Sequence, residues 1–144
     1  MKTLALTLSL LLAGATFSFG QCGHKFTITA SKTEHLDANG SVTRTDEEKA
    51  TVVIGTKDIT IDVVNSNDEH KMAGTIKSDS CNWPLAYKEG KTVIKAVIDN
   101  GNGEDKNVTI TITGTNGKVT LLFEMEGETD DRIRVTADKF EASA

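Results

Sequence analysis

The sequence is poor in cysteine, proline and aromatic residues, and each shortage narrows what the protein can be. It has 2 cysteines and 1 proline in 144 residues, and aromatic residues make up 5% of the chain. The cysteines are not in a C-x-x-C motif, so a metal or redox centre of that kind is not predicted. Basic residues are also in the minority, with 16 Lys and Arg against 21 Asp and Glu, and this disfavours nucleic acid as a partner.

Residues 1–20 have the features of a secretory signal peptide. Lys2 is the charged start, Leu4 to Leu12 form the apolar run, and Ser18-Phe19-Gly20 is a small-residue end. The apolar run is too short to span a bilayer, and no later stretch is long enough. We therefore expect export, with cleavage before Gln21.

Two alternatives concern the same region. A cut after Ala15 is the second choice of cleavage site. A lipid anchor at Cys22 is a minor alternative, because Phe19-Gly20-Gln21 departs from the Leu-small-small pattern before a lipidated cysteine. In each case residues 21–144 are predicted to form a single β domain that is periplasmic or secreted, with no membrane span.

Export implies an oxidising compartment, so we expect Cys22 and Cys81 to form a disulfide. The bond would close a loop of about 60 residues. In the chain-entropy account this stabilises the fold by on the order of 4 kcal/mol, through restriction of the unfolded chain.

The clearest structural signal is a hairpin between Val108 and Met125. Two alternating runs meet there at Asn116-Gly117, the residues that best tolerate the positive φ angles of a type I′ turn. A two-residue turn sets Thr115 opposite Lys118. Counting outward then gives an apolar face of three pairs: Ile112 with Leu121, Ile110 with Phe123, and Val108 with Met125. The opposite face is mostly threonine, as expected for a half-buried antiparallel ribbon.

Other alternating runs predict further strands. They are Phe26–Ala30 with a continuation to Leu36, Val52–Ile54, Ile59–Val63, Met72–Ser78, Thr92–Asp99 and a last strand through Ile133, Val135 and Ala137. Turn counting pairs Leu36 with Val42, Ile54 with Ile59, Ile98 with Val108, and Ile133 with Met125.

Three segments are interpreted as connections. Residues 44–49 are charged without a period and are interpreted as a solvated connection, with a short helical turn as the alternative. Residues 65–71 are polar, and residues 79–90 form the longest loop. The last of these contains Trp83 and Tyr87, the only Trp and the only Tyr.

The mature chain lacks a helical period longer than a turn or two, so the predicted fold is all-β. Short connections favour an antiparallel up-and-down meander of about eight strands. A closed barrel, which hides its strand edges, is favoured over a two-sheet sandwich. The exported start, single domain and meander resemble the small bacterial lipocalin-like (calycin) barrels. The chain does not carry their Gly-x-Trp near the first strand, and no functional residue is assigned from the resemblance.

Motifs for catalysis or metal binding are not evident. The loop Asp99–Asp105 gathers carboxylates and amides, but its glycines fall where an EF-hand needs oxygen ligands. The spacing of His24, His35 and His70 does not require them to converge. There is also no nucleophile elbow, zincin helix or phosphate-binding glycine loop. We therefore predict no catalytic residue, metal or cofactor, and an enzyme is not favoured.

Two functions remain, from different classes. The first is an exported binding protein that holds a small apolar ligand inside the barrel; the residues predicted to line it, or simply to fill the core, are Phe26, Ile61, Ile94, Ile110, Phe123, Met125 and Val135. The second is a structural or interaction module of the envelope, or an inhibitor, that contacts another protein. The contact would be made by Trp83 and Tyr87, or by an outward apolar face containing Val93, Val97 and Leu122. In the binding protein, Trp83 and Tyr87 would instead form a lid over the barrel. For Trp83 the competing interpretation is a plug at one end of the core.

Overall fold

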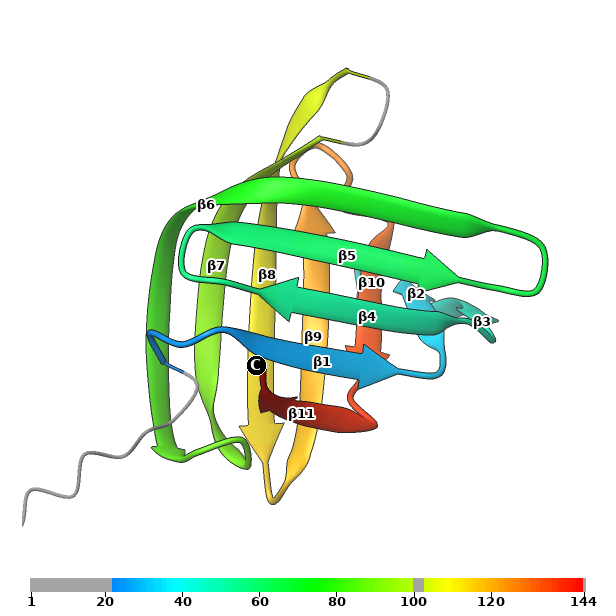
Figure 1. The fold of residues 1–144 in the computed structure, drawn as a ribbon. Coiled ribbons are helices and arrows are strands. Elements are labelled where there is room, and N and C mark those ends of the chain that lie inside the picture. Colours follow the sequence, from blue (N-terminus) through cyan, green and yellow to red (C-terminus); the bar gives the residue numbers. More distant parts are fainter. Residues whose placement is uncertain (1–21, 100–102, 144) are drawn as a thin grey trace, which may run out of the picture.

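A computed structural model describes residues 22–99 and 103–143 of the chain. The predicted signal peptide and its cleavage site lie outside the described residues, as does part of the Asp99–Asp105 loop. The described part is a single antiparallel sheet of eleven strands without a helix (Figure 1). The strands are β1 (Phe26–Ala30), β2 (Thr33–Leu36), β3 (Val42–Asp46), β4 (Lys49–Ile54), β5 (Asp58–Val64), β6 (Glu69–Leu85), β7 (Glu89–Asp99), β8 (Asp105–Thr115), β9 (Lys118–Met125), β10 (Arg132–Thr136) and β11 (Lys139–Ala142).

The all-β antiparallel fold is confirmed, whereas the closed barrel of eight strands is not. The sheet order is β11-β1-β4-β5-β6-β7-β8-β9-β10-β2-β3, which ends at β11 and β3. Consecutive strands β1 and β2 nevertheless occupy distant positions in this order, and so do β10 and β11. Since only two residues join each of these pairs, the sheet must curl until its distant parts meet.

Three strand breaks lie at one corner of the sheet and raise the strand count. The segment predicted to continue from Phe26 to Leu36 is divided into β1 and β2, and the other two breaks separate β3 from β4 and β10 from β11. The breaks are at Ser31-Lys32, Glu47-Glu48 and Ala137-Asp138. They lie side by side, because Ala30 pairs with Ala50 and the Asp138 backbone N–H donates to the Thr29 carbonyl at 2.7 Å. The interpretation of residues 44–49 as a solvated connection was therefore wrong, since most of them belong to β3 and β4.

Strand β6 connects the two halves of the sheet. Its first part pairs with β5 and its later part with β7, and the ladder with β7 shifts at Ile76/Ser78 and at Asn82/Leu85. Such irregularities bend a strand. Figure 1 shows β6 running beside β5 in one layer, with β1 and β4, and then turning to run beside β7 in a second layer, with β8 and β9. The predicted loops at 65–71 and 79–90 were therefore too long, because β6 spans Glu69–Leu85.

The central hairpin has the predicted register. Ile112 pairs with Leu121, Ile110 with Phe123 and Val108 with Met125, and both turn residues have positive φ, 52° at Asn116 and 82° at Gly117. Leu36 with Val42 and Ile54 with Ile59 are likewise confirmed.

Two other predicted registers were wrong by two residues. Val108 faces Ala96 instead of Ile98, and Ile133 faces Phe123 instead of Met125. A shift of two keeps each side chain on its own face, so the alternating pattern does not distinguish the two registers.

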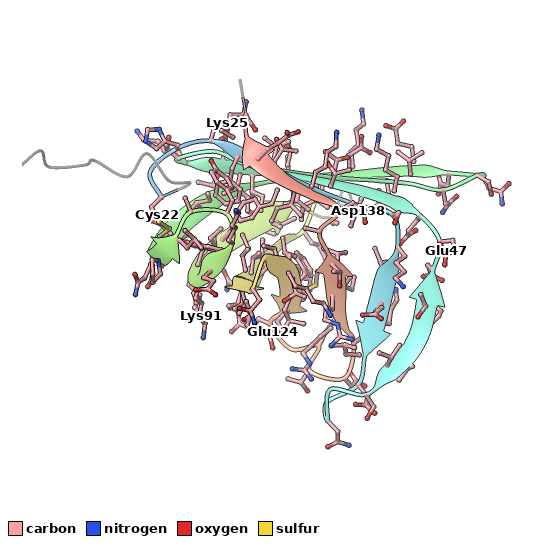
Figure 2. The ribbon with its side chains drawn as sticks, turned by 90° about the horizontal axis from the view of Figure 1, so that it is seen from below. Cys22, Lys25, Glu47, Lys91, Glu124 and Asp138 are labelled. Carbon is pink, nitrogen blue, oxygen red and sulfur yellow. A yellow bond between two sulfur atoms is a disulfide. The ribbon has the colours of Figure 1, made fainter. Side chains whose placement is uncertain are left out.

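The core lies between the two layers. Figure 2 shows carbon-rich side chains filling this space, with nitrogen and oxygen tips on the outside. Ile98, Ile110 and Ile112 are 0% exposed, which leaves no water-sized space against them. Burying one such side chain contributes about 1.5–3 kcal/mol.

Replacement of Ile110 by Ala tests this core. We expect the substitution to lower the free energy of unfolding by about 2–5 kcal/mol, because it removes buried methyl groups and leaves a cavity. Thr111→Ala, on the outer face of the same strand, should cost about 1 kcal/mol or less. Urea unfolding measures both, and a near-neutral Ile110→Ala would contradict the described core.

Candidate functional site at the disulfide end of the sheet

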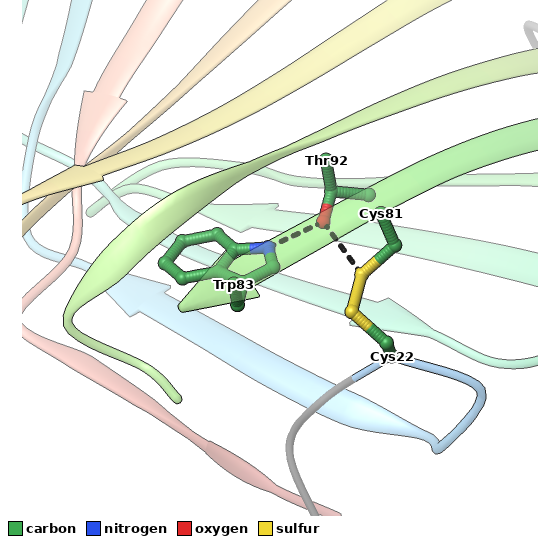
Figure 3. The surroundings of a disulfide bond; sticks show 4 residues. All are labelled: Cys22, Cys81, Trp83 and Thr92. Carbon is green, nitrogen blue, oxygen red and sulfur yellow. Dashed lines mark hydrogen bonds between the residues drawn. A yellow bond between two sulfur atoms is a disulfide. The ribbon is translucent and has the colours of Figure 1, made fainter. Parts of the chain in front are cut away.

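The predicted disulfide is present and joins two separate parts of the fold. Cys22 lies just before β1, and Cys81 lies in the later part of β6, with 5.8 Å between their Cα atoms and a sequence separation of 59. The bond therefore holds the start of the domain against the bent strand (Figure 3). The cross-link would help to stabilise this bend, because it restricts the unfolded chain.

A hydrogen-bond chain leads from the core to this disulfide. The indole Nε1–H of Trp83 donates to the Thr92 hydroxyl at 2.7 Å, and that hydroxyl donates to Cys81 Sγ at 3.3 Å (Figure 3). Thr92 lies opposite Cys81 in the β6–β7 ladder and is one of the few buried polar residues of the core. The chain satisfies two buried polar groups that would otherwise be costly.

Aromatic side chains close this end of the core. Phe140 of β11 makes edge-on contacts with Phe26, Trp83 and Tyr87, at ring-centroid distances of 5.2, 5.4 and 4.8 Å. Trp83 also needs a glycine beside it, because a Cβ at Gly114 would lie 2.6 Å from the indole ring. Trp83 is 8% exposed, so the structure places it as a plug of the core.

Beside the disulfide lies a recess of about 130 Å³. Three buried apolar residues, Phe26, Ile54 and Ile94, contribute to its lining. The remaining lining residues are more polar or more exposed: Cys22, Gly23, His24, Gly55, Thr56, Ile76, Asp79, Cys81 and Thr92. The recess is therefore a small hollow with apolar walls and polar groups placed around them, the combination typical of ligand sites.

Only part of the predicted lining set reaches this recess. Phe26 and Ile94 line it, whereas Ile61, Ile110, Phe123 and Val135 are buried core residues and Met125 packs against that core. Three hollows of about 430–510 Å³ lie elsewhere and have charged residues such as Lys95, Glu47 and Lys71 in their lining. Two further members of the predicted set reach them, since Met125 lines one and Ile61 lines another.

The predicted outward apolar face is not continuous. Val93 pairs with Thr111, and Thr111 pairs with Leu122, so a threonine separates the two apolar side chains. Among the residues described, the large apolar side chains that are most exposed are Val42, Val64 and Leu85. Leu85 is 51% exposed and stands at the turn between β6 and β7, beside the Tyr87 region.

Sequence reasoning missed a polar cluster around His35. Its Nδ1 lies 2.8 Å from Asp131 Oδ1, while its Nε2 lies 2.8 Å from an Arg44 nitrogen and 3.3 Å from Asp46 Oδ2. The imidazole side chain is only 13% exposed. Counting from the pairing of Leu36 with Val42 would set His35 opposite Thr43, but the ladder shifts between His35 and Leu36 and sets His35 opposite Arg44. The turn therefore gave no signal for this cluster. The ring nitrogens point to different partners, and no group of His, Cys, Asp or Glu within 22–99 and 103–143 is arranged to hold a metal ion.

No helix in the described ranges is long and apolar enough to cross a membrane. Comparison with known proteins finds no family model, curated sequence or solved structure that matches this chain. Function must therefore be argued from the geometry alone.

Tyr87 provides a pH test of the aromatic cluster. Burial raises the pKa of its phenol above the ordinary value, so the native state favours the neutral form. This contribution to stability is present below the ordinary pKa of about 10 and is lost as the pH rises through the folded-state value. Because Tyr87 is the only tyrosine, phenolate absorbance follows it alone. Its midpoint should be higher in native than in urea-unfolded protein, and equal midpoints would contradict the packing against Phe140.

Proposed function

We propose that this chain is an exported, non-enzymatic binding protein that holds a small apolar ligand in the recess beside the Cys22–Cys81 disulfide. One observation carries the proposal, which is that buried Phe26, Ile54 and Ile94 line a hollow bordered by polar groups. Apolar walls would supply affinity, and the nearby hydroxyl, imidazole and carboxylate groups would fix orientation. The disulfide is compatible with export, because such bonds persist in oxidising compartments.

The size of the recess limits the ligand. Sites for drug-sized ligands have volumes of about 300–1,000 Å³, whereas this recess has about 130 Å³. A matching ligand has only a few non-hydrogen atoms, such as a short aliphatic or small ring compound with one polar group. If a larger molecule binds, most of it must lie outside the recess.

The tight packing between the layers favours the recess, and not the interior, as the place where the ligand binds. Ile98, Ile110 and Ile112 are 0% exposed, so a ligand against them would require the core to open. The interior of an eight-stranded barrel is barely wide enough for its own side chains. Packing of this kind favours a filled interior with binding at its end.

The proposal includes a lipocalin-like architecture in a modified form. If β1 with β2, β3 with β4, and β10 with β11 are each counted as one bent strand, the chain has eight segments in up-and-down order. The first segment then pairs with the last, through β1 with β11 and β2 with β10. We interpret this arrangement as a barrel whose wall folds at the corner.

An interaction module or inhibitor of the envelope is the second candidate. It is favoured by Leu85, which is 51% exposed although it follows the buried Trp83 region in β6. A partner could cover Leu85 at the β6–β7 turn without disturbing the Trp83 plug. Exposed apolar side chains at a rigid turn are suitable contacts.

Native mass spectrometry of protein purified from its own source tests both candidates. We expect wild-type protein to retain a small molecule, and Thr56→Trp to lose it, because Thr56 is exposed and lines the recess. Thr45→Trp, on exposed strand β3, is the matched control and should retain the molecule.

The alternative outcomes are distinct. A retained protein that is lost on Leu85→Ser would favour the interaction module instead. Loss of the small molecule in both Trp variants would place binding outside the recess, and a wild-type protein that retains neither kind of molecule would contradict the binding proposal.

A further inference from the structure

The two sulfur atoms of the disulfide have unequal surroundings. Cys22 is an exposed residue that precedes the first strand, whereas Cys81 is half-buried inside β6. Cys81 also sits directly opposite Thr92, which is 3% exposed. Both cysteines line the recess, but Cys22 is the more exposed residue, so an incoming reagent meets the Cys22 side of the bond more readily.

The Thr92 hydroxyl proton is directed at Cys81. A threonine hydroxyl has one proton to donate, and an indole N–H can only donate. Because Trp83 Nε1 donates to the Thr92 oxygen at 2.7 Å, the hydroxyl proton is free for Cys81 Sγ, 3.3 Å away. Trp83 is itself fixed by packing against Phe140 and Gly114. The donor is thus held in place before any reaction occurs.

This arrangement matters for thiol–disulfide exchange. The attacking thiolate bonds to one sulfur, and the other leaves with the electron pair as a thiolate. A leaving thiolate that receives a hydrogen bond is stabilised, because bonds to a charged acceptor are stronger than bonds to a neutral one. The more accessible sulfur is that of Cys22. The sulfur that leaves as the better stabilised thiolate is that of Cys81.

We propose that Cys22 is a thiol-exchange site, at which an external thiol forms a mixed disulfide while Cys81 leaves as a thiolate. In this step the Cys22–Cys81 bond breaks, a bond forms between the external sulfur and Cys22 Sγ, and the electron pair passes to Cys81 Sγ beside Thr92. If the reagent is a dithiol, its second thiolate attacks the mixed disulfide. That step releases Cys22 as a thiolate and converts the reagent to its own disulfide.

Exchange would also change the neighbouring recess. Cys22, Gly23 and His24 form part of its lining and are tethered to β6 by the disulfide. Once the bond opens, this part of the lining loses its covalent tether to β6, while Trp83 keeps its partner Thr92. The exchange chemistry does not depend on whether the recess binds a ligand.

Mapping the mixed disulfide is the test. Folded wild-type protein is treated with excess glutathione, quenched in acid and digested, and the adduct is located by peptide mass spectrometry. We expect glutathione on Cys22, with free thiol at Cys81. An adduct mainly on Cys81, or an equal division between the two, would overturn the proposal.

Substitutions at Thr92 test its role as a positioning residue. Thr92→Val removes the donor and should slow adduct formation about tenfold or more, whereas Thr92→Ser keeps the hydroxyl and should react at close to the wild-type rate. Equal rates for the Val and Ser variants, each with a native near-ultraviolet spectrum, would exclude the hydrogen bond as a cause.

A further variant covers the case in which Thr92→Val does not fold. Trp83→Phe removes the indole donor and leaves the Thr92 hydroxyl, so it should still direct glutathione to Cys22. If its adduct lies mainly on Cys81, the assignment of the leaving sulfur is wrong.

Discussion

The structure depends on the burial of one apolar row that crosses β7, β8 and β9. Ile94, Ile110 and Phe123 lie opposite one another across these strands and share the inner face. A slip of one residue would turn this row to the solvent and bring threonines inside. The resulting loss, at about 1.5–3 kcal/mol for each large side chain, exceeds the contribution of any single surface ion pair in the protein.

The same requirement accounts for the bends in the sheet. A sheet with one apolar face must cover that face, and here it does so by curling back on itself at a corner and through the bent strand β6. Small residues, Ala30 and Ala50, pair beside the corner and are both buried. At the opposite end, Trp83 and Phe140 fill the opening, and the Cys22–Cys81 bond holds the segment before β1 beside them.

Local turn chemistry could be predicted from the sequence, whereas long-range bending could not. Asn116-Gly117 determined its hairpin register because a two-residue turn leaves one way to count. The β7–β8 register was wrong by two because a longer turn allows registers of the same parity. The observed ladder runs from the pair Gly90 and Gly114 to the pair Asp99 and Asp105.

The candidate site was predictable only in part. The disulfide and two lining residues, Phe26 and Ile94, followed from export and alternation. The role of Thr92 could not be predicted, because its hydroxyl bonds to Trp83. Trp83 reaches it from β6, in a segment that was predicted to be a loop. The His35 cluster also required knowledge of the third partner, Asp131, which is distant in sequence.

The central claim is that the space between the layers is filled by side chains and that the recess by the disulfide is a hollow with buried core residues in its lining. A crystal structure under xenon pressure tests this directly, because xenon enters apolar cavities that water leaves empty. The account predicts no xenon in contact with Ile98, Ile110 or Ile112, and allows it where Phe26, Ile54 and Ile94 line the recess. Xenon bound against Ile110 would contradict it.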